Sequence, residues 1–133
     1  TFTFDFEDAR SVRAVMVYNS RKKVSDFFGS DGPETVVFTN NCTTSINYVL
    51  KGVLSPSDHI VVSDLEHNAV MRPLKAMGIE VSKAKVSLFD NEETLLNFKK
   101  EIKPNTKMIF CTAASNVLGK ILPIEKIVSF QFS

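Results

Sequence analysis

A run of small polar residues has the chemistry to hold a phosphate group. Residues 39–45 read TNNCTTS and stand between a short apolar segment and a segment with helical spacing. The first turn of a helix offers unpaired N–H groups and a positive dipole end, and nearby hydroxyl groups can bond phosphate oxygens. The alternative is an ordinary turn with a helix cap. The sequence contains neither G-x-G-x-x-G nor G-x-x-x-x-G-K-[ST], so the usual nucleotide-phosphate loops are not supported.

Two further residues could contact a flat ligand. The ring of His67 could stack on a ligand, move a proton or bind a metal, and the amide of Asn116 could form hydrogen bonds from the small-residue segment 112–119. Each residue also has a plainer interpretation, since a histidine beside a helix start is often a cap and Asn116 could simply serve a turn. A metal site is not favoured, because no second His or Cys group accompanies Asp64, Glu66 and His67.

The elements that would position these residues alternate along the chain. Short apolar runs of strand type are separated by segments with helical spacing. We predict strands at 35–38, at 59–63, within 79–86 and at 107–111, and helices at about 6–28, 43–54, 69–77, 91–102 and 124–128. The apolar runs show little polar alternation, which is typical of a mostly parallel sheet with helices on both faces. The sequence therefore predicts an α/β fold.

Such a sheet would bring the polar segments together. In open parallel sheets, ligands bind beyond the carboxyl ends of the strands. The segments that carry Thr43, His67 and Asn116 each follow a predicted strand. We therefore expect them at one edge of the sheet, where they could share a ligand that has both a phosphate and a ring.

Composition excludes some other classes of protein. The chain has 133 residues, of which 44% are hydrophobic, so it can form a core. Its net charge of +1 gives no support for a nucleic-acid or polybasic membrane partner. No apolar run approaches the ~20 residues that cross a bilayer. Cys42 and Cys111 have no metal or redox spacing, which fits a reducing compartment, and we expect a cytoplasmic protein.

Three segments together resemble the class V aminotransferase family of fold-type I pyridoxal-phosphate enzymes, and within it the cysteine desulfurases and selenocysteine lyases. They are VFTNNCTTSIN at 37–47, DLEHNAV at 64–70 and ASNVLG at 114–119, with Pro123 and Ile124 following. Their order and spacing match the family across almost the whole chain. The resemblance implies that residues 1–133 are the N-terminal part of the large cofactor-binding domain, incomplete at the C-terminus.

The resemblance implies roles for four residues. Backbone at Cys42, and the hydroxyl and backbone of Thr43, would hold the phosphate of pyridoxal 5'-phosphate. His67 would stack on the pyridine ring and assist proton transfers as a catalytic residue, while Asn116 would bond the phenolic oxygen of the ring. Cys42 would then not be the cysteine that carries a persulfide. Family members often carry Glu where Thr44 stands and His where Ala113 stands, which blurs the subfamily.

The resemblance also implies an activity. Intact relatives convert cysteine to alanine and pass the sulfur to a cysteine thiolate, or catalyse a related lyase or transaminase reaction. They act on a small amino-acid substrate as homodimers, and a sulfur-acceptor protein can take part. In the family, the Asp that pairs with the pyridine nitrogen and the Schiff-base Lys both follow the motif at Asn116, and neither can be placed before Ser133. We therefore expect this chain to be inactive alone.

Two alternatives to an enzyme fragment stay open at this point. The first is a truncated, non-catalytic protein of the same fold that binds a cofactor or a partner without turnover. The second is an unrelated flavodoxin-like or nucleotide-binding α/β domain, which would bind a flavin or a nucleotide and would be indifferent to the loss of His67.

Overall fold

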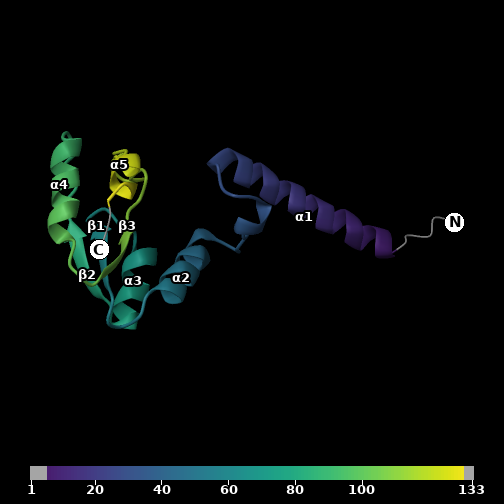
Figure 1. The fold of residues 1–133 in the computed structure, drawn as a ribbon, viewed down its shortest axis with the longest axis horizontal. Coiled ribbons are helices and arrows are strands. Elements are labelled where there is room, and N and C mark those ends of the chain that lie inside the picture. Colours follow the sequence, from purple (N-terminus) through teal and green to yellow (C-terminus); the bar gives the residue numbers. More distant parts are fainter. Residues whose placement is uncertain (1–5, 131–133) are drawn as a thin grey trace. The chain divides into compact units, whose positions relative to one another are not determined.

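The computed structural model describes the backbone of residues 6–130 and the side chains of residues 11–130. The elements follow in the order α1 (Phe6–Phe28), a 3-10 helix (Pro33–Thr35), α2 (Cys42–Val53), β1 (His59–Ser63), α3 (Asn68–Met77), β2 (Glu80–Ala84), α4 (Asn91–Glu101), β3 (Thr106–Phe110) and α5 (Ile124–Val128) (Figure 1). The chain divides into two compact units, Thr1–Asn40 and Asn41–Ser133. The assignment of residues 1–133 to one part of a larger domain stays a prediction.

The first unit is built from a long helix and the turn that ends it. Helix α1 ends at Phe28, and Gly29 follows it with φ of 65°, a left-handed conformation that glycine adopts at little cost. The Ser25 and Ser30 hydroxyls are 2.9 Å apart, and the Ser30 N–H donates to the Ser25 carbonyl at 3.0 Å. Ser25 is the only buried residue among side chains 11–40, so this unit has no apolar core of its own in the described part of the chain.

The strand predicted at 35–38 is wrong. Residues Pro33–Thr35 form a 3-10 helix, and Val36 has an extended backbone with φ of −101° and ψ of 122°. The exposed fractions are 72% for Val37 and 52% for Phe38. An apolar, β-branched run favours extended backbone, but a strand also needs a hydrogen-bonded neighbour. No strand of the described residues pairs with this segment.

The second unit contains a three-stranded parallel sheet in the order β2-β1-β3. Its central strand β1 pairs with β2 from His59 opposite Glu80 to Ser63 opposite Ala84, and with β3 along its other edge. All five residues of β1 are buried. A parallel strand with neighbours on both edges and helices on both faces is expected to be apolar throughout, and HIVVS nearly is.

Helices cover both faces of this sheet, so the predicted α/β fold with a parallel sheet is confirmed. Figure 1 shows α2 and α3 on one face and α4 and α5 on the other. Side chains of β1 alternate between two cores, because successive residues of a strand point to opposite faces. Ile60 and Val62 pack with Leu50, Leu54, Val70, Leu74 and Ile79. Val61 packs with Ala84, Val86, Leu95, Phe98, Leu122 and Ile127.

The remaining predicted elements agree with the structure within one or two residues at most ends. Strand β2 covers residues 80–84, inside the range 79–86 in which a strand was predicted. Capping residues account for several helix starts: the Asn41 side chain accepts from Thr44 N–H before α2, and the Asp90 side chain accepts from Glu92 and Glu93 N–H before α4. Within the described residues, none of the helices combines the length and apolarity needed to cross a bilayer.

Candidate functional site

The polar TNNCTTS segment provides the start of α2. Asn41 is the cap, and its Oδ1 accepts from the Thr44 N–H at 2.8 Å. Cys42 and Thr43 are the first two residues of the helix and are both exposed. The N–H groups of a first helical turn lack intrahelical acceptors and carry the positive end of the helix dipole. This end of α2 therefore has the chemistry to receive an anion, beside the Thr43 hydroxyl.

His67 caps α3, so the plainer interpretation of this residue is confirmed. Its Nδ1 accepts a hydrogen bond from the Ala69 N–H at 3.0 Å. A neutral imidazole that accepts at Nδ1 carries its proton at Nε2. The cap therefore fixes both the ring and its tautomer, and it leaves Nε2 as the nitrogen that can exchange a proton with a ligand. Capping does not compete with the predicted contact to a ligand, because the ring remains exposed.

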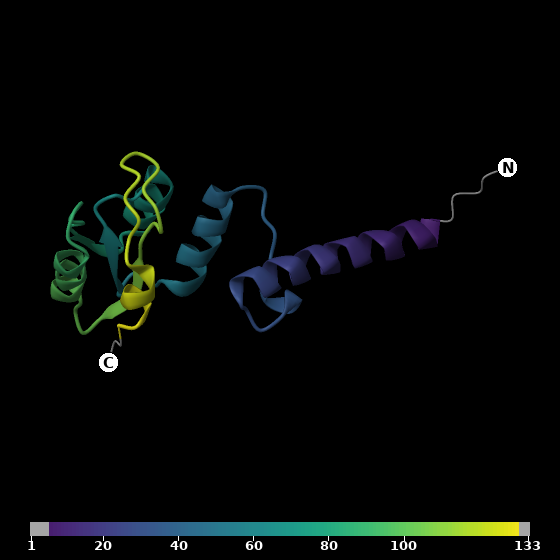
Figure 2. The same ribbon diagram turned by 90° about the horizontal axis from the view of Figure 1, so that it is seen from above.

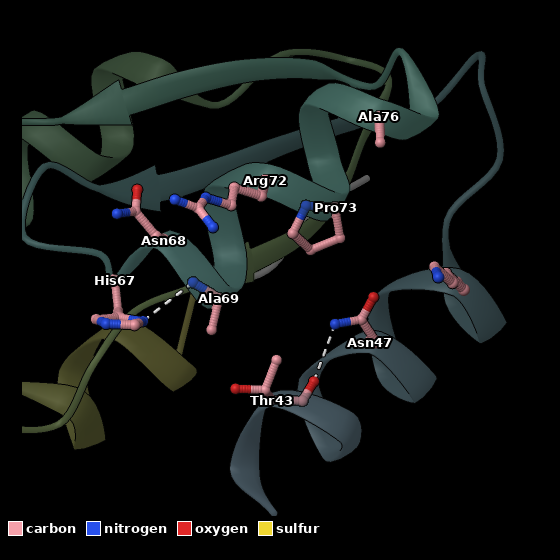
Figure 3. Close-up of a pocket in the computed structure, with 9 residues that line it drawn as sticks. Thr43, Asn47, His67, Asn68, Ala69, Arg72, Pro73 and Ala76 are labelled. Carbon is pink, nitrogen blue, oxygen red and sulfur yellow. Dashed lines mark hydrogen bonds between the residues drawn. The ribbon is translucent and has the colours of Figure 1, made fainter.

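Thr43 and His67 line the same pocket, which has a volume of about 440 Å³ and lies between α2 and α3. In Figure 3, Thr43 and Asn47 project from α2 toward residues of α3 across the gap. The full lining consists of Thr43, Asn47, Lys51, His67, Asn68, Ala69, Arg72, Pro73 and Ala76. Two of these side chains, Lys51 and Arg72, are cationic and none is a carboxylate, so the electrostatic field of the pocket favours an anionic ligand.

Two carboxylates fasten the loop that carries His67 to the strands on either side. Asp64 Oδ1 accepts from the Val86 N–H at 3.0 Å, just beyond the end of β2. Glu66 Oε1 accepts from the Thr112 N–H at 2.6 Å, just beyond the end of β3, and from the Ser63 hydroxyl at 2.6 Å. The loop after the central strand is therefore held at the carboxyl edge of the sheet from both sides.

Asn116 lies in a hairpin-like loop that follows β3. Ser115 N–H donates to the Lys120 carbonyl at 2.9 Å, and Leu122 N–H donates to the Ala113 carbonyl at 3.0 Å. Figure 2 shows this segment as the yellow-green loop that extends from the sheet. Asn116 is exposed near its turn and does not line the pocket that contains Thr43 and His67. The structure thus brings two of the four predicted residues together, puts Cys42 beside Thr43 and leaves Asn116 apart.

The two cysteines have different surroundings. Cys42 is exposed at the start of α2, whereas Cys111 is half-buried after β3. Burial, and secondarily the negative charge of Glu66, raises the pKa of the Cys111 thiol to about 11. A thiol with that pKa is almost entirely protonated near neutral pH and is a poor nucleophile. Within residues 11–130, no cluster of three His, Cys, Asp or Glu side chains has the geometry to hold a metal ion.

Sequence reasoning missed the structural use of Glu66 and the two cations of the pocket. It considered Glu66 only as a metal ligand, whereas the carboxylate bonds a residue 46 positions away in the sequence. No local pattern predicts such a contact. The sequence contains a weak indication that Lys51 and Arg72 belong to the pocket. Each follows a lining asparagine, Asn47 or Asn68, by one helical turn and so lies on the same helix face.

Comparisons with known proteins agree with this architecture. The model of the family described as Aminotransferase class-V matches residues 8–131. A probable cysteine desulfurase of Mycolicibacterium paratuberculosis is 32% identical over 126 residues, which are 89% of this chain and 18% of the relative. The mitochondrial cysteine desulfurase of Saccharomyces cerevisiae is 32% identical over 121 residues, which are 84% of this chain and 23% of the relative. The chain thus spans about a fifth of the length of these two proteins.

Solved structures share the fold. The cystine C-S lyase C-DES, in complex with its product cysteine persulfide, superposes with a TM-score of 0.78 at 23% identity. The superposition covers 97% of this chain and 36% of C-DES. A mutant of C-DES with glycine covalently linked to its PLP cofactor gives the same TM-score over 98% of this chain. The family match over residues 8–131 does not support an unrelated flavodoxin-like or nucleotide-binding domain.

Proposed function

Because the chain belongs to the class V aminotransferase family, we propose that it forms the cofactor-binding front of a pyridoxal-phosphate-dependent cysteine desulfurase. The observation that carries the proposal is the pocket that Thr43 and His67 share. The desulfurase relatives support the reaction class, cysteine to alanine with transfer of sulfur. When it is bound, pyridoxal phosphate supplies the electron sink for such chemistry, and the protein supplies binding and orientation.

The residues of the pocket fit the phosphate of this cofactor. The open first turn of α2, the Thr43 hydroxyl and the two cationic side chains of the lining all favour an anion. Cys42, as the first residue of α2, would contribute backbone N–H. The side chain of Cys42 is exposed beside this position, so a bound phosphate would limit access to its thiol.

His67 would orient the cofactor ring and move a proton. Its bond from the Ala69 N–H at 3.0 Å holds the imidazole at one edge of the pocket. An aromatic face against a flat ring contributes about 0.5–1.5 kcal/mol beyond its buried area. Since Nδ1 is occupied by this bond, Nε2 is the atom that would hold or release a proton. Asn116 would act on the phenolic oxygen, which requires its loop to approach the pocket.

The activity would require chain segments beyond the family motifs found here. The chain spans 18% and 23% of two desulfurase relatives. The resemblance to the family implies that the Schiff-base lysine follows the motif at Asn116. We propose that residues 1–133 bind the cofactor without turning over cysteine. The homodimer and the sulfur-acceptor protein of intact relatives are part of the same proposal, as is a cytoplasmic location.

Binding of pyridoxal phosphate to the 133-residue chain, measured by equilibrium dialysis, tests the proposal. We expect saturable binding that Thr43→Ala weakens by roughly 10- to 150-fold, because a hydrogen bond to a charged group contributes about 1.5–3 kcal/mol. His67→Ala should weaken binding by roughly 2–10-fold. Thr44→Ala is the matched control, since the Thr44 side chain neighbours Thr43 on α2 but does not line the pocket.

Alkylation of the cysteines gives a second readout. Pyridoxal phosphate should slow alkylation of Cys42 and leave the slow alkylation of Cys111 unchanged, because only Cys42 lies at the proposed phosphate site. Saturable binding that is insensitive to both Thr43→Ala and His67→Ala would refute the site. Turnover of cysteine by the 133-residue chain alone would refute the proposal that catalysis needs further segments.

A further inference from the structure

We infer that Glu66 is the positioning residue of this site, and that the reach of its side chain sets the placement of His67. The inference rests on the proposed function for its meaning, but its geometry is independent of any ligand. Glu66 immediately precedes His67 and is half-buried, and its Oε1 accepts from the Ser63 hydroxyl and from the Thr112 N–H, both at 2.6 Å. One oxygen thus joins the ends of β1 and β3.

The bond from the Thr112 N–H to Glu66 links two of the three segments that carry predicted cofactor contacts. His67 follows Glu66 directly, and Thr112 opens the segment that leads to Asn116. The Ser63 hydroxyl, which donates to Glu66, also accepts from the Leu65 N–H at 3.3 Å, so the turn between β1 and α3 closes on itself. Loss of the Glu66 oxygen would release the His67 loop from β3 and would leave the Thr112 N–H without this acceptor.

The neighbouring carboxylate, Asp64, ties the same loop to the other edge of the sheet, at a segment that carries no predicted cofactor contact. Asp64 Oδ1 accepts from the Val86 N–H, and the Asp64 N–H donates to the Ala84 carbonyl at 3.0 Å. These bonds tie the loop to β2 and to the connection toward α4, where no predicted cofactor contact lies. Asp64 is therefore a matched control, because it is a carboxylate in the same loop that accepts from a backbone N–H just beyond a flanking strand.

The positioning of His67 by Glu66 depends on the length of the Glu66 side chain rather than on its charge. Both hydrogen bonds end on the same oxygen, so the carbonyl oxygen of a glutamine at position 66 can accept both. Aspartate keeps the charge but is one methylene shorter, so it cannot span from the loop to the Thr112 N–H. Glu66→Gln and Glu66→Asp thus separate reach from charge with minimal change in volume.

The experiment is NMR of the 133-residue chain with ¹⁵N-labelled histidine at pH 8.5, at which imidazole groups are uncharged. The chain has only two histidines, so His67→Ala assigns the spectrum. We expect the parent, Glu66→Gln and Asp64→Ala to show an unprotonated Nδ1 at His67. In Glu66→Asp and Glu66→Ala, the two tautomers of His67 should average. In a second, uniformly ¹⁵N-labelled sample of the same variants, the Thr112 amide should lose protection from hydrogen exchange.

Binding of pyridoxal phosphate to the same variants separates this inference from the proposed function. Glu66→Asp should raise the Kd roughly fivefold or more, while Glu66→Gln and Asp64→Ala stay within about twofold of the parent. If the His67 tautomer depends on Glu66 but no variant binds the cofactor, the positioning role stands and the proposed function falls. A His67 signal that is unchanged in Glu66→Asp, or disturbed equally in Asp64→Ala, overturns the positioning role.

Discussion

The two units of this chain contain similar apolar residues but use them differently. Exposed apolar side chains of the first unit include Val12, Val15, Met16, Val17, Tyr18, Phe27 and Phe28. The second unit buries two apolar clusters, one on each face of its sheet. Helix α1 has no apolar core to pack against among side chains 11–40, whereas the second unit depends on contacts between residues distant in the sequence. Unfolding should therefore be cooperative in the second unit and local in the first.

The largest expected difference between the units comes from one substitution made in both. Phe98→Ala removes a fully buried ring, 0% exposed, and should lower the free energy of unfolding by about 3–5 kcal/mol. Phe27→Ala should cost less than about 1 kcal/mol, because that ring is 81% exposed and only its edge contact with Phe28 is lost. Urea unfolding followed by circular dichroism measures both. Equal costs would mean that the Phe27 face is covered in solution.

Hydrogen exchange should show the next largest difference. Backbone amides of Val61 and Val62 lie in the central strand and should exchange only when the second unit unfolds. Amides of Val15 and Met16 lie in a helix segment whose side chains are all exposed, and they should exchange at least ~100-fold faster through local opening. Similar protection of the amides in β1 and in α1 would contradict the expectation that the first unit opens locally and the second unfolds cooperatively.

A smaller effect is expected at a helix cap of the second unit. The Asp90 carboxylate accepts from the Glu92 N–H at 2.8 Å and from the Glu93 N–H at 3.2 Å. Asp90→Ala should lower the free energy of unfolding by about 1 kcal/mol, and Asp90→Asn, which keeps an acceptor, should stay close to the parent. The urea midpoint reports both values. If Asp90→Ala leaves the urea midpoint unchanged, packing of Thr94, Leu95 and Phe98 alone determines the start of α4.

The smallest expected effect is a loss of stability at mildly acidic pH that involves His59 and is absent at neutral pH. His59 is fully buried in β1, and its Nδ1 lies 2.7 Å from the Thr106 hydroxyl oxygen. Burial, and next the charge of Lys103, lowers the pKa of His59, while Glu80 and Glu101 oppose this. The unfolded chain therefore binds a proton at higher pH than the folded chain does. Stability should be full above about pH 6.5 and should fall as the pH drops through the lower folded pKa.

Urea unfolding between pH 7.5 and pH 5 tests this dependence, with His59→Gln as the variant that should remove it. Glu80 provides an internal contrast, because hydrogen bonds from Lys103 and Asn105 lower its pKa and its contribution should be lost only at more acidic pH. If the free energy of unfolding of His59→Gln still falls between pH 7.5 and pH 5, the pH dependence belongs to another group. The stability of the first unit, which contains no histidine, should not change with pH in this range.

The sequence by itself determined the order of the elements from α2 to α5 and the types of the site residues. Periodicity and caps located α2, α3 and α4, because helices depend mainly on residues three or four positions apart. The strand that precedes His67 indicated this residue, because a parallel sheet places strand ends at one edge. Thr43 was indicated by its place at a helix start, since the apolar run before it is not a strand.

Only the tertiary structure decided which of these residues meet. It left the apolar segment 36–38 without a partner strand, since a strand exists only through its neighbours. It put Thr43 and His67 on one pocket and Asn116 outside that pocket. It also turned Glu66 into a link between β1 and β3, a contact across 46 residues that no local pattern encodes. Long-range contacts of this kind depend on the packing of the whole sheet, so they follow from the fold and not from any segment read alone.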